Sequence, residues 1–129
     1  MSKELTVLVV DADQAFRESV ANLLLACGVE KFEMASTTEE AWEKISMTFF
    51  DVVLVDLFMP QMKGLHFARE LLTGIPETKI ILLIEDQQLP LLNRAQKTEL
   101  NFPTVLKSFV SGNLPQLLSD ESNSGSPKT

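Results

Sequence analysis

Cysteine is almost missing from the 129-residue sequence, and so are the features that direct a chain to a membrane. The one thiol, Cys27, cannot form a disulfide within the chain and fits a reducing compartment. No basic start is followed by an apolar run, and no apolar run approaches the roughly 20 residues that cross a bilayer. We therefore expect a soluble, cytoplasmic protein that does not bind membranes.

Positive charge is also scarce. The chain has 11 Lys and Arg residues against 18 Asp and Glu residues, which gives a formal net charge of -7. This excess of negative charge works against direct binding to nucleic acid or to an anionic membrane. No internal repeats occur, and the length fits one domain that buries a core without disulfides or structural metals. The expected partner is therefore another protein.

Short apolar runs alternate with amphipathic stretches along the chain. The runs have the length and composition of buried parallel strands, except for one weaker run that is typical of a sheet edge. The expected strands are Leu5–Val10, the edge candidate Lys31–Ala35, Val52–Val55, Ile80–Ile84 and Thr104–Leu106. Strands and helices in strict alternation predict an α/β domain with a parallel sheet.

Apolar residues at helical spacing predict a helix after each strand. The expected helices cover Phe16–Cys27, Trp42–Phe49, Leu65–Ile75, Leu91–Ala95 and a short fifth stretch, Val110–Leu118, weakened by Pro115. Thr37 followed by Glu40 predicts a capping box at the second helix, and Gly74 followed by Pro76 ends the third. We expect residues 1–118 to form the domain, and residues 119–129, rich in Ser and Gly, to be a disordered tail or the start of a linker.

Acidic residues and one lysine follow the expected strands at the edge where ligands collect in open parallel sheets. They are Asp11 and Asp13 after the first strand, Asp56 after the third, Glu85 and Asp86 after the fourth, and Lys107 after the fifth. Carboxylates from neighbouring strands repel each other, and a hard divalent cation such as Mg²⁺ relieves that repulsion. A lysine on the same edge supplies a charge for an anion held by the metal. Asp56 would then be a nucleophile that accepts a phosphoryl group, with Mg²⁺ and Lys107 absorbing its charge.

Three segments, "LTVLVVDADQAFR", "DVVLVDLFMPQMKG" and "VLKSF", resemble the landmark segments of the response regulator receiver domain, over about Leu5 to Leu118. The pattern D-x-x-M-P-x-M-x-G that begins at Asp56 is specific, because it joins a strand end, a tight turn and a helix start. The resemblance implies a flavodoxin-like (βα)5 sheet of order 2-1-3-4-5. It also implies a two-component phosphorelay, in which a histidine kinase or phosphotransfer protein supplies the phosphoryl group and an output domain or partner protein receives the signal.

The resemblance assigns a role to each matching residue. Asp56 would be the phosphoacceptor, Lys107 the phosphate contact, Asp11 an acidic-pocket metal ligand and the backbone carbonyl of Phe58 a further Mg²⁺ ligand. Such a domain is not an enzyme toward other substrates, and at most catalyses its own phosphorylation and dephosphorylation.

Several positions depart from the family pattern. Receivers place a second acid directly after the first, and this chain has Ala12 there, which weakens the expected Mg²⁺ site. Asp13 either supplies the missing ligand, directly or through water, or caps the first helix. The strand-four hydroxyl is replaced by Ile84 and the aromatic switch residue by Thr104, so both parts of the usual relay are altered. The proline after Lys107 has become Ser108.

Two other functions compete with a phosphorylated receiver. A degenerate pseudo-receiver would bind a partner protein without phosphorylation. The stretch "VVDAD" also resembles the opening of haloacid dehalogenase-type phosphatases, with Asp11 as nucleophile and Asp13 as general acid, but Lys107 follows the later acidic pair instead of preceding it. Nucleotide binding is disfavoured because the first loop has neither glycines nor hydroxyls to cradle a phosphate. The lone His66 is expected to be a surface or core residue, and Met59 and Met62 to be packing residues.

Overall fold

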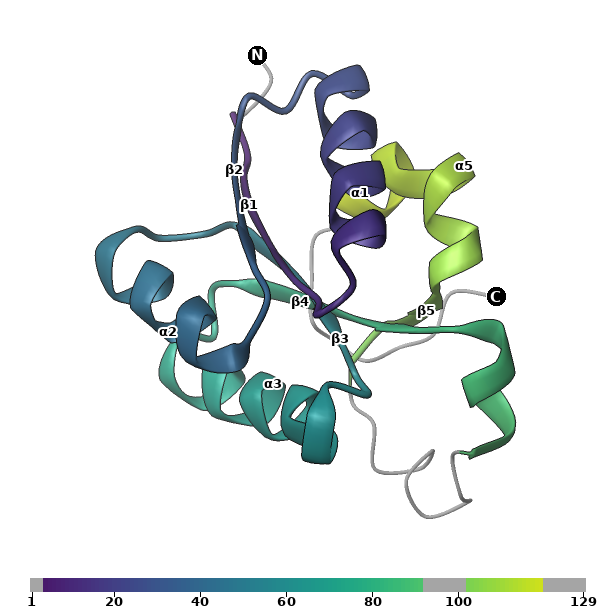
Figure 1. Cartoon of the computed structure of the whole chain (residues 1–129). Helices are drawn as coiled ribbons and strands as arrows, with labels where there is room; N and C mark the ends of the chain where they lie inside the picture. The colour runs from purple at the N-terminus through teal and green to yellow at the C-terminus, as the bar shows by residue number, and fades with distance from the viewer. Residues whose placement is uncertain (1–3, 92–101, 120–129) are drawn as a thin grey trace.

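A computed structural model describes residues 4–91 and 102–119 of the chain. Five parallel strands form one sheet of order β2-β1-β3-β4-β5 (Figure 1). They are β1 (Thr6–Val10), β2 (Lys31–Ala35), β3 (Val52–Asp56), β4 (Lys79–Ile84) and β5 (Thr104–Leu106). The predicted doubly wound α/β fold and its strand order 2-1-3-4-5 are therefore confirmed.

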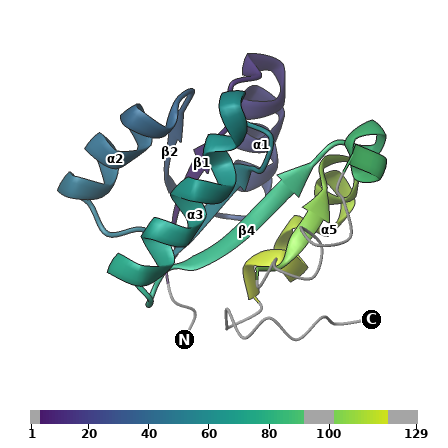
Figure 2. The same cartoon turned by 90° about the horizontal axis from the view of Figure 1, so that it is seen from below.

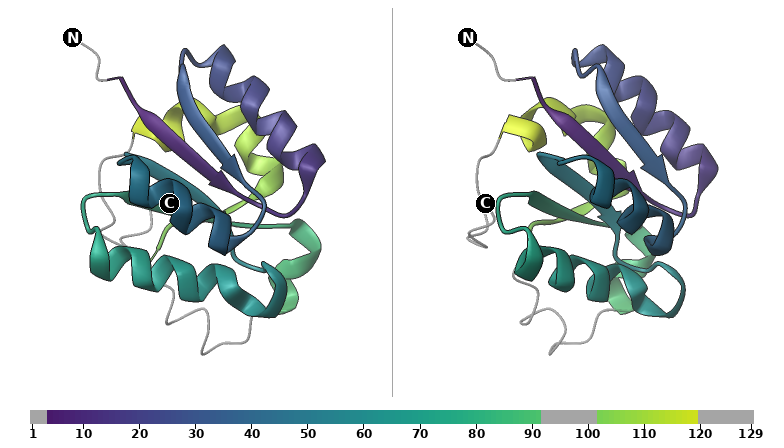
Figure 3. Two further views of the ribbon diagram at one scale, coloured as in Figure 1. Left: turned by 60° about the vertical axis from the view of Figure 1, so that its left-hand side comes forward. Right: turned by 90° about the vertical axis from the view of Figure 1, so that its left-hand side faces the viewer.

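Helices cover both faces of the sheet. They are α1 (Gln14–Ala26), α2 (Thr38–Met47), α3 (Lys63–Gly74) and α5 (Lys107–Ser119), with the short 3-10 helices η1 (Pro60–Met62) and η2 (Asp86–Leu91). Helices α1 and α5 lie on one face and α2 and α3 on the other (Figure 3). Within the described ranges, no helix has the length and apolar character needed to cross a membrane.

The core has two halves because strand side chains alternate between the faces of the sheet. Val7 and Val9 of β1 pack toward α1 and α5, whereas Leu8 and Val10 pack toward α2 and α3. Helix α3 lies along β3 and β4 (Figure 2), where Phe67 is buried. Every residue of β3 and β4 is buried, as expected for central parallel strands.

The ends of the first two helices follow from polar side chains and one glycine. The Thr37 hydroxyl accepts a hydrogen bond from the Glu40 N–H at 3.0 Å, so the predicted N-cap of α2 is confirmed. The Glu40 carboxylate accepts from the Ser36 N–H at 2.8 Å, one residue earlier than in the expected capping box. Helix α1 ends at Ala26, and the exposed Cys27 is its C-cap, followed by Gly28 with a left-handed φ of 86°.

Two details of the predicted helices are wrong. Helix α2 ends at Met47, and Phe49 lies beyond it with 51% of its surface exposed, while Phe50 is 2% exposed and belongs to the core. From the sequence, either Phe49 or Phe50 could be the buried residue near the end of the helix. The extended backbone at Thr48 ends α2 and makes Phe50 the buried one.

Helix α5 is 13 residues long rather than short, and it continues through Pro115 to Ser119. Proline removes one backbone donor there, but burial of Val110, Leu114 and Leu118 against the sheet holds the helix. At its far end, the buried Lys79 Nζ donates a hydrogen bond of 2.5 Å to the Leu117 carbonyl.

Two predicted segments fall largely outside the described residues. The chain leaves β4 through η2, which ends at Leu91, so the remainder of the predicted fourth helix, Leu92 to Ala95, is outside them. The same holds for the predicted tail, 119–129, except that Ser119 is the last residue of α5.

Candidate functional site

The register of the parallel sheet brings four charged residues to one edge. Val10 of β1 lies beside Val55 of β3, so the residues that follow, Asp11 and Asp56, are neighbours at the carboxyl ends of these strands. On the other side of β3, Ile84 of β4 lies beside Leu106 of β5. The next residue on each of these two strands is Glu85 and Lys107, respectively.

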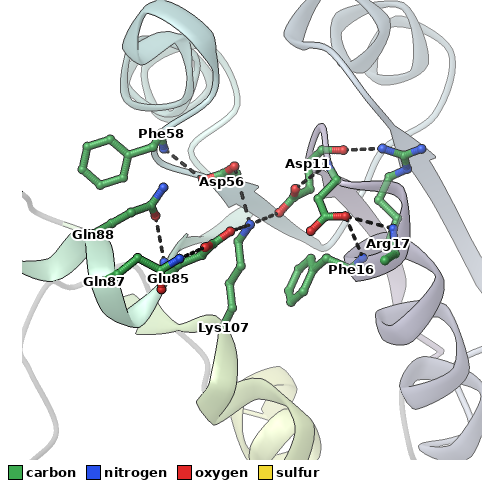
Figure 4. Close-up of polar contacts among 11 residues, drawn as sticks. Asp11, Phe16, Arg17, Asp56, Phe58, Glu85, Gln87, Gln88 and Lys107 are labelled. Carbon is green, nitrogen blue, oxygen red and sulfur yellow. Dashed lines mark hydrogen bonds and ion pairs between the residues drawn. The ribbon is translucent and has the colours of Figure 1, made fainter.

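Lys107 is the centre of this cluster (Figure 4). Its Nζ lies 2.8 Å from Asp11 Oδ2, 3.6 Å from Asp56 Oδ2 and 3.7 Å from Glu85 Oε2. The same ammonium lies 4.7 Å from the centre of the Phe16 ring, within cation–π range. Three carboxylates face one cation, so the cluster keeps an excess of negative charge.

Asp11 is fully buried. Its Oδ1 accepts a hydrogen bond from the Asp13 N–H at 2.9 Å, and the Arg17 guanidinium donates to its backbone carbonyl at 2.6 Å. Its Oδ2 has the Lys107 ammonium as charge partner but no aligned hydrogen-bond donor among the described residues. A buried carboxylate oxygen without hydrogen bonds is costly, so this atom favours a cation beside it.

Asp56 is also buried, and its two oxygens have different surroundings. Oδ1 accepts a hydrogen bond from the Phe58 N–H at 3.0 Å, while Oδ2 faces Lys107. Burial raises the pKa of Asp56, the charge of Lys107 lowers it and the charge of Asp11 raises it again, with a net rise above the ordinary value. Ionised Asp56 is therefore less favourable in this buried position than it would be in water.

The charge of Lys107 is favoured by its neighbours. Burial by itself lowers the pKa of Lys107, but the contact with Asp11 and the charges of Asp56 and Glu85 outweigh burial and raise it overall. Lys107 is thus a permanent cation at this edge of the sheet.

The turn after Asp56 explains the M-P-x-M-x-G part of the motif. Gln61 and Met62 adopt left-handed φ angles of 64° and 58°, which turn the chain from β3 into α3. A Cβ on Gly64 would lie 2.0 Å from the Asp56 carbonyl oxygen, so only glycine lets α3 begin this close to the strand end. Met59 is buried and Met62 packs on the core, which confirms that both are packing residues.

The donor set at this edge fits a hydrated Mg²⁺ ion. Asp11 and Asp56 supply two carboxylates, the number that Mg²⁺ commonly takes from a protein while it keeps several waters. Asp11 Oδ2, whose neighbour among the described residues is the Lys107 ammonium, is a suitable ligand, and the Phe58 carbonyl follows Asp56 by two residues. Ala12 is exposed and offers no donor. In the parts of the chain that the structure describes, no three His, Cys, Asp or Glu side chains are grouped to hold a metal.

Asp13 does not join the cluster. Its carboxylate accepts hydrogen bonds from the N–H groups of Ala15 at 3.0 Å and Phe16 at 3.4 Å, so Asp13 is the N-cap of α1. Of the two roles that the sequence left open for Asp13, the structure therefore shows the cap.

The altered switch positions are occupied in other ways. Ile84 is buried in the core between the sheet and α3, and the Thr104 hydroxyl donates to the Phe102 carbonyl at 3.2 Å. Ser108 Oγ donates to Asp86 Oδ1 at 2.8 Å, which ties the loop after β4 to the start of α5.

The sequence placed Glu85 after β4 among the acidic residues of this edge, but it did not pair Glu85 with Lys107. The register between β4 and β5 would have shown this pair, because it places Ile84 beside Leu106 and therefore Glu85 beside Lys107. The sequence alone does not give that register. Phe16 was likewise expected only as a helix core residue, and its ring also faces the Lys107 ammonium. His66 pairs with Glu70 at 3.2 Å on the exposed side of α3, as expected for a surface histidine.

Comparison with known proteins gives consistent relatives. The sequence model of the response regulator receiver domain matches residues 7–119. The response regulator Rre1 of Synechocystis is 32% identical over 71 residues, which are 55% of this chain and 31% of that protein. The autoinducer 1 sensor kinase/phosphatase LuxN of Vibrio campbellii is 30% identical over 107 residues, 81% of this chain and 12% of that protein. The chain thus spans less than a third of the length of these two relatives.

Solved structures agree with this assignment. The response regulator protein TrrA of Thermotoga maritima, determined in complex with Mg(2+)-BeF, is 28% identical with a TM-score of 0.71, covering 88% of this chain and 96% of that one. A receiver domain protein from Clostridium thermocellum is 23% identical with a TM-score of 0.72, covering 88% and 90%, and shows the same fold. The haloacid dehalogenase alternative finds no support here, because Asp13, its general acid, is the α1 cap. The chain belongs to the response regulator receiver domain family of two-component signalling.

Proposed function

We propose that Asp56 accepts a phosphoryl group from the phosphohistidine of a histidine kinase or phosphotransfer protein. The observation that carries this proposal is the position of the Asp56 carboxylate, held by the Phe58 N–H on one oxygen and 3.6 Å from the Lys107 ammonium on the other. Among the described residues no backbone N–H donates to Oδ2, and this oxygen attacks phosphorus. The P–N bond of the phosphohistidine breaks, its electron pair remains on the imidazole nitrogen, and Asp56 becomes an acyl phosphate.

The neighbouring residues support the same chemistry. Asp11, Asp56 and the Phe58 carbonyl would hold Mg²⁺, which when bound neutralises the phosphoryl oxygens. Lys107 is fixed by Asp11 at 2.8 Å and places its charge next to the position of the new phosphoryl group. The domain acts on no other substrate, and at most promotes its own phosphorylation and dephosphorylation.

Four features favour a second candidate, a receiver that binds its partner without phosphorylation. Ala12 has no metal donor and Asp13 is engaged as a helix cap. The usual relay residues are replaced by the buried Ile84 and by Thr104, whose hydroxyl bonds to the Phe102 carbonyl. A phosphoryl group on Asp56 then lacks the usual side-chain route toward β5 and α5.

The setting of this function is proposed on the same basis. The signal passes to an output domain or a partner protein, in the cytoplasm, from a receiver unit of residues 1–118. The net charge of -7 supports protein partners over direct contact with nucleic acid or membrane.

The test is phosphorylation of the purified chain by acetyl phosphate with Mg²⁺, followed by intact-protein mass spectrometry. We expect one added phosphoryl group on the wild type, none on Asp56→Asn because an amide is a poor nucleophile, and slower addition on Asp11→Asn. Asp13→Asn is the matched control, since asparagine also caps helices and this side chain lies outside the cluster.

The outcomes separate the candidates. An Asp56→Asn protein that is labelled like the wild type contradicts the assignment of Asp56. A folded wild type that takes up no phosphoryl group supports the phosphorylation-independent function. Hydrolysis of an aryl phosphate ester by the wild type would revive the phosphatase alternative.

A further inference from the structure

Glu85 lies on the open side of the charged cluster. Its side chain is 37% exposed, whereas the Lys107 side chain is 9% exposed and Asp11 is fully buried. The register of β4 and β5 sets the two chain positions side by side, and Figure 4 shows Glu85 reaching Lys107 from the side of η2, away from Asp11. Glu85 is thus a carboxylate at the entrance to the Lys107 ammonium.

The loop after β4 holds Glu85 in this orientation. Gln87 Nε2 donates to Glu85 Oε1 at 2.6 Å, which leaves Oε2 directed at Lys107. The Glu85 N–H donates to Gln88 Oε1 at 2.8 Å, so the backbone is fixed as well. Two hydrogen bonds that involve Glu85 therefore maintain a contact of 3.7 Å that charge alone would not fix.

An incoming phosphoryl group must compete for Lys107. A lysine ammonium has three N–H donors, and here three carboxylates and the Phe16 ring already surround it. Asp11 is nearest and buried, and Asp56 is the nucleophile. Glu85 makes the longest of the three contacts and is the most exposed, so it is the group that a phosphoryl oxygen displaces.

We propose that Glu85 is a built-in competitor of the phosphoryl group for Lys107 and slows the phosphorylation of Asp56. This inference rests on the proposed function of Asp56. In the step that Glu85 slows, Asp56 Oδ2 bonds to phosphorus, the bond from phosphorus to the leaving group breaks, and the leaving group keeps the electron pair. Glu85 occupies the cation that should receive the phosphoryl oxygens, and its own charge repels the anionic donor.

The experiment compares the rate of acetyl phosphate labelling, with Mg²⁺, in the wild type, Glu85→Gln and Asp86→Asn. Asp86→Asn is the matched control, because it removes the same charge from the next residue, whose carboxylate contacts Ser108. We expect Glu85→Gln to be labelled about fivefold faster than the wild type, as for loss of one partly exposed ion pair, and Asp86→Asn to stay near the wild-type rate. Glu85→Ala, which removes the side chain altogether, should be at least as fast as Glu85→Gln. The gain should shrink at high salt.

The labelling rates of these variants decide whether Glu85 slows the phosphorylation of Asp56. Equal acceleration in Glu85→Gln and Asp86→Asn would show a general charge effect and overturn the proposal. Slower labelling of both Glu85 variants, with unchanged thermal unfolding, would show that Glu85 helps to orient Lys107 and would overturn it too. Equal labelling of all proteins keeps the function of Asp56 and removes only the role of Glu85, whereas absence of labelling in every protein removes both.

Discussion

Replacing Gly64 by alanine should destabilise the domain and disturb Asp56 at the same time. The added Cβ would lie 2.0 Å from the Asp56 carbonyl oxygen and 2.8 Å from that of Leu57, whereas carbon and carbonyl oxygen normally stay about 3.3 Å apart or more. The start of α3 must therefore move away from β3 by about 1 Å. Such overpacking costs about 3 kcal/mol against backbone, and the better helix propensity of alanine returns about 1, so we expect a net loss of about 2 kcal/mol in the free energy of unfolding.

Urea unfolding measures this loss, and Gly74→Ala provides the control in the same helix. Nothing lies within 4 Å of a Cβ at Gly74, so that variant should gain up to about 1 kcal/mol. The rate of Asp56 labelling should fall in Gly64→Ala only, because the Phe58 N–H that holds Asp56 moves with the turn. Equal stability of Gly64→Ala and Gly74→Ala would refute the close approach of α3 to the strand end.

Three further predictions concern charge and capping. Asp56→Asn should raise the free energy of unfolding at pH 7, because burial raises the pKa of Asp56 and makes its ionised carboxylate costly. The pKa of Asp56 is higher in the folded than in the unfolded protein. The wild type is therefore fully free of this penalty below the unfolded pKa of 3.8, and it loses stability as the pH rises through the folded pKa and Asp56 ionises. Urea unfolding should therefore show the gain at pH 7 and none below pH 3.8, and a less stable variant at pH 7 would contradict it. Ala12→Asp should tighten Mg²⁺ binding about tenfold in calorimetry, because it returns a carboxylate to the site. The control Ala15→Asp adds the same charge at an exposed position of α1 and should change the affinity little. Equal Mg²⁺ affinities of Ala12→Asp and the wild type would mean that no ligand is missing. Thr37→Ala should cost about 1 kcal/mol in urea unfolding through loss of the α2 cap, against little change for the exposed Thr73→Ala; equal effects would refute the cap.

The sheet could be predicted because its strands are short apolar runs with clear ends. Burial on both faces leaves few polar residues in β3 and β4, and the order 2-1-3-4-5 was implied by the resemblance to the receiver family. Phe49 and Phe50 could not be distinguished, because both are apolar and the choice depends on where α2 stops. Helix α5 was expected to be short because Pro115 weakens a helix, and tertiary burial outweighs that loss.

The sequence could predict which residues gather at the candidate site, but not which of them contact each other. Residues that follow strands reach the same edge whatever the offset, which is why Asp11, Asp56 and Lys107 were found together. The partner of Glu85 depends on the register between β4 and β5, and the sequence does not state it. The role of Asp13 depended on side-chain direction at a helix start, where capping and metal binding use the same residue types.

Helix α5 is anchored at both ends by lysines. At its start, the Lys107 ammonium is held by carboxylates of three other strand ends, and near its finish the Leu117 carbonyl accepts from Lys79, the first residue of β4. The two anchors are separated by most of a helix of 13 residues, about 20 Å long. A helix that is held at both ends does not rotate away from the sheet about one of them. Because the Lys79 contact holds the far end and Val110, Leu114 and Leu118 are buried along the helix, a displacement of Lys107 is resisted over the whole length of α5, which agrees with the missing side-chain route from Asp56 toward this helix.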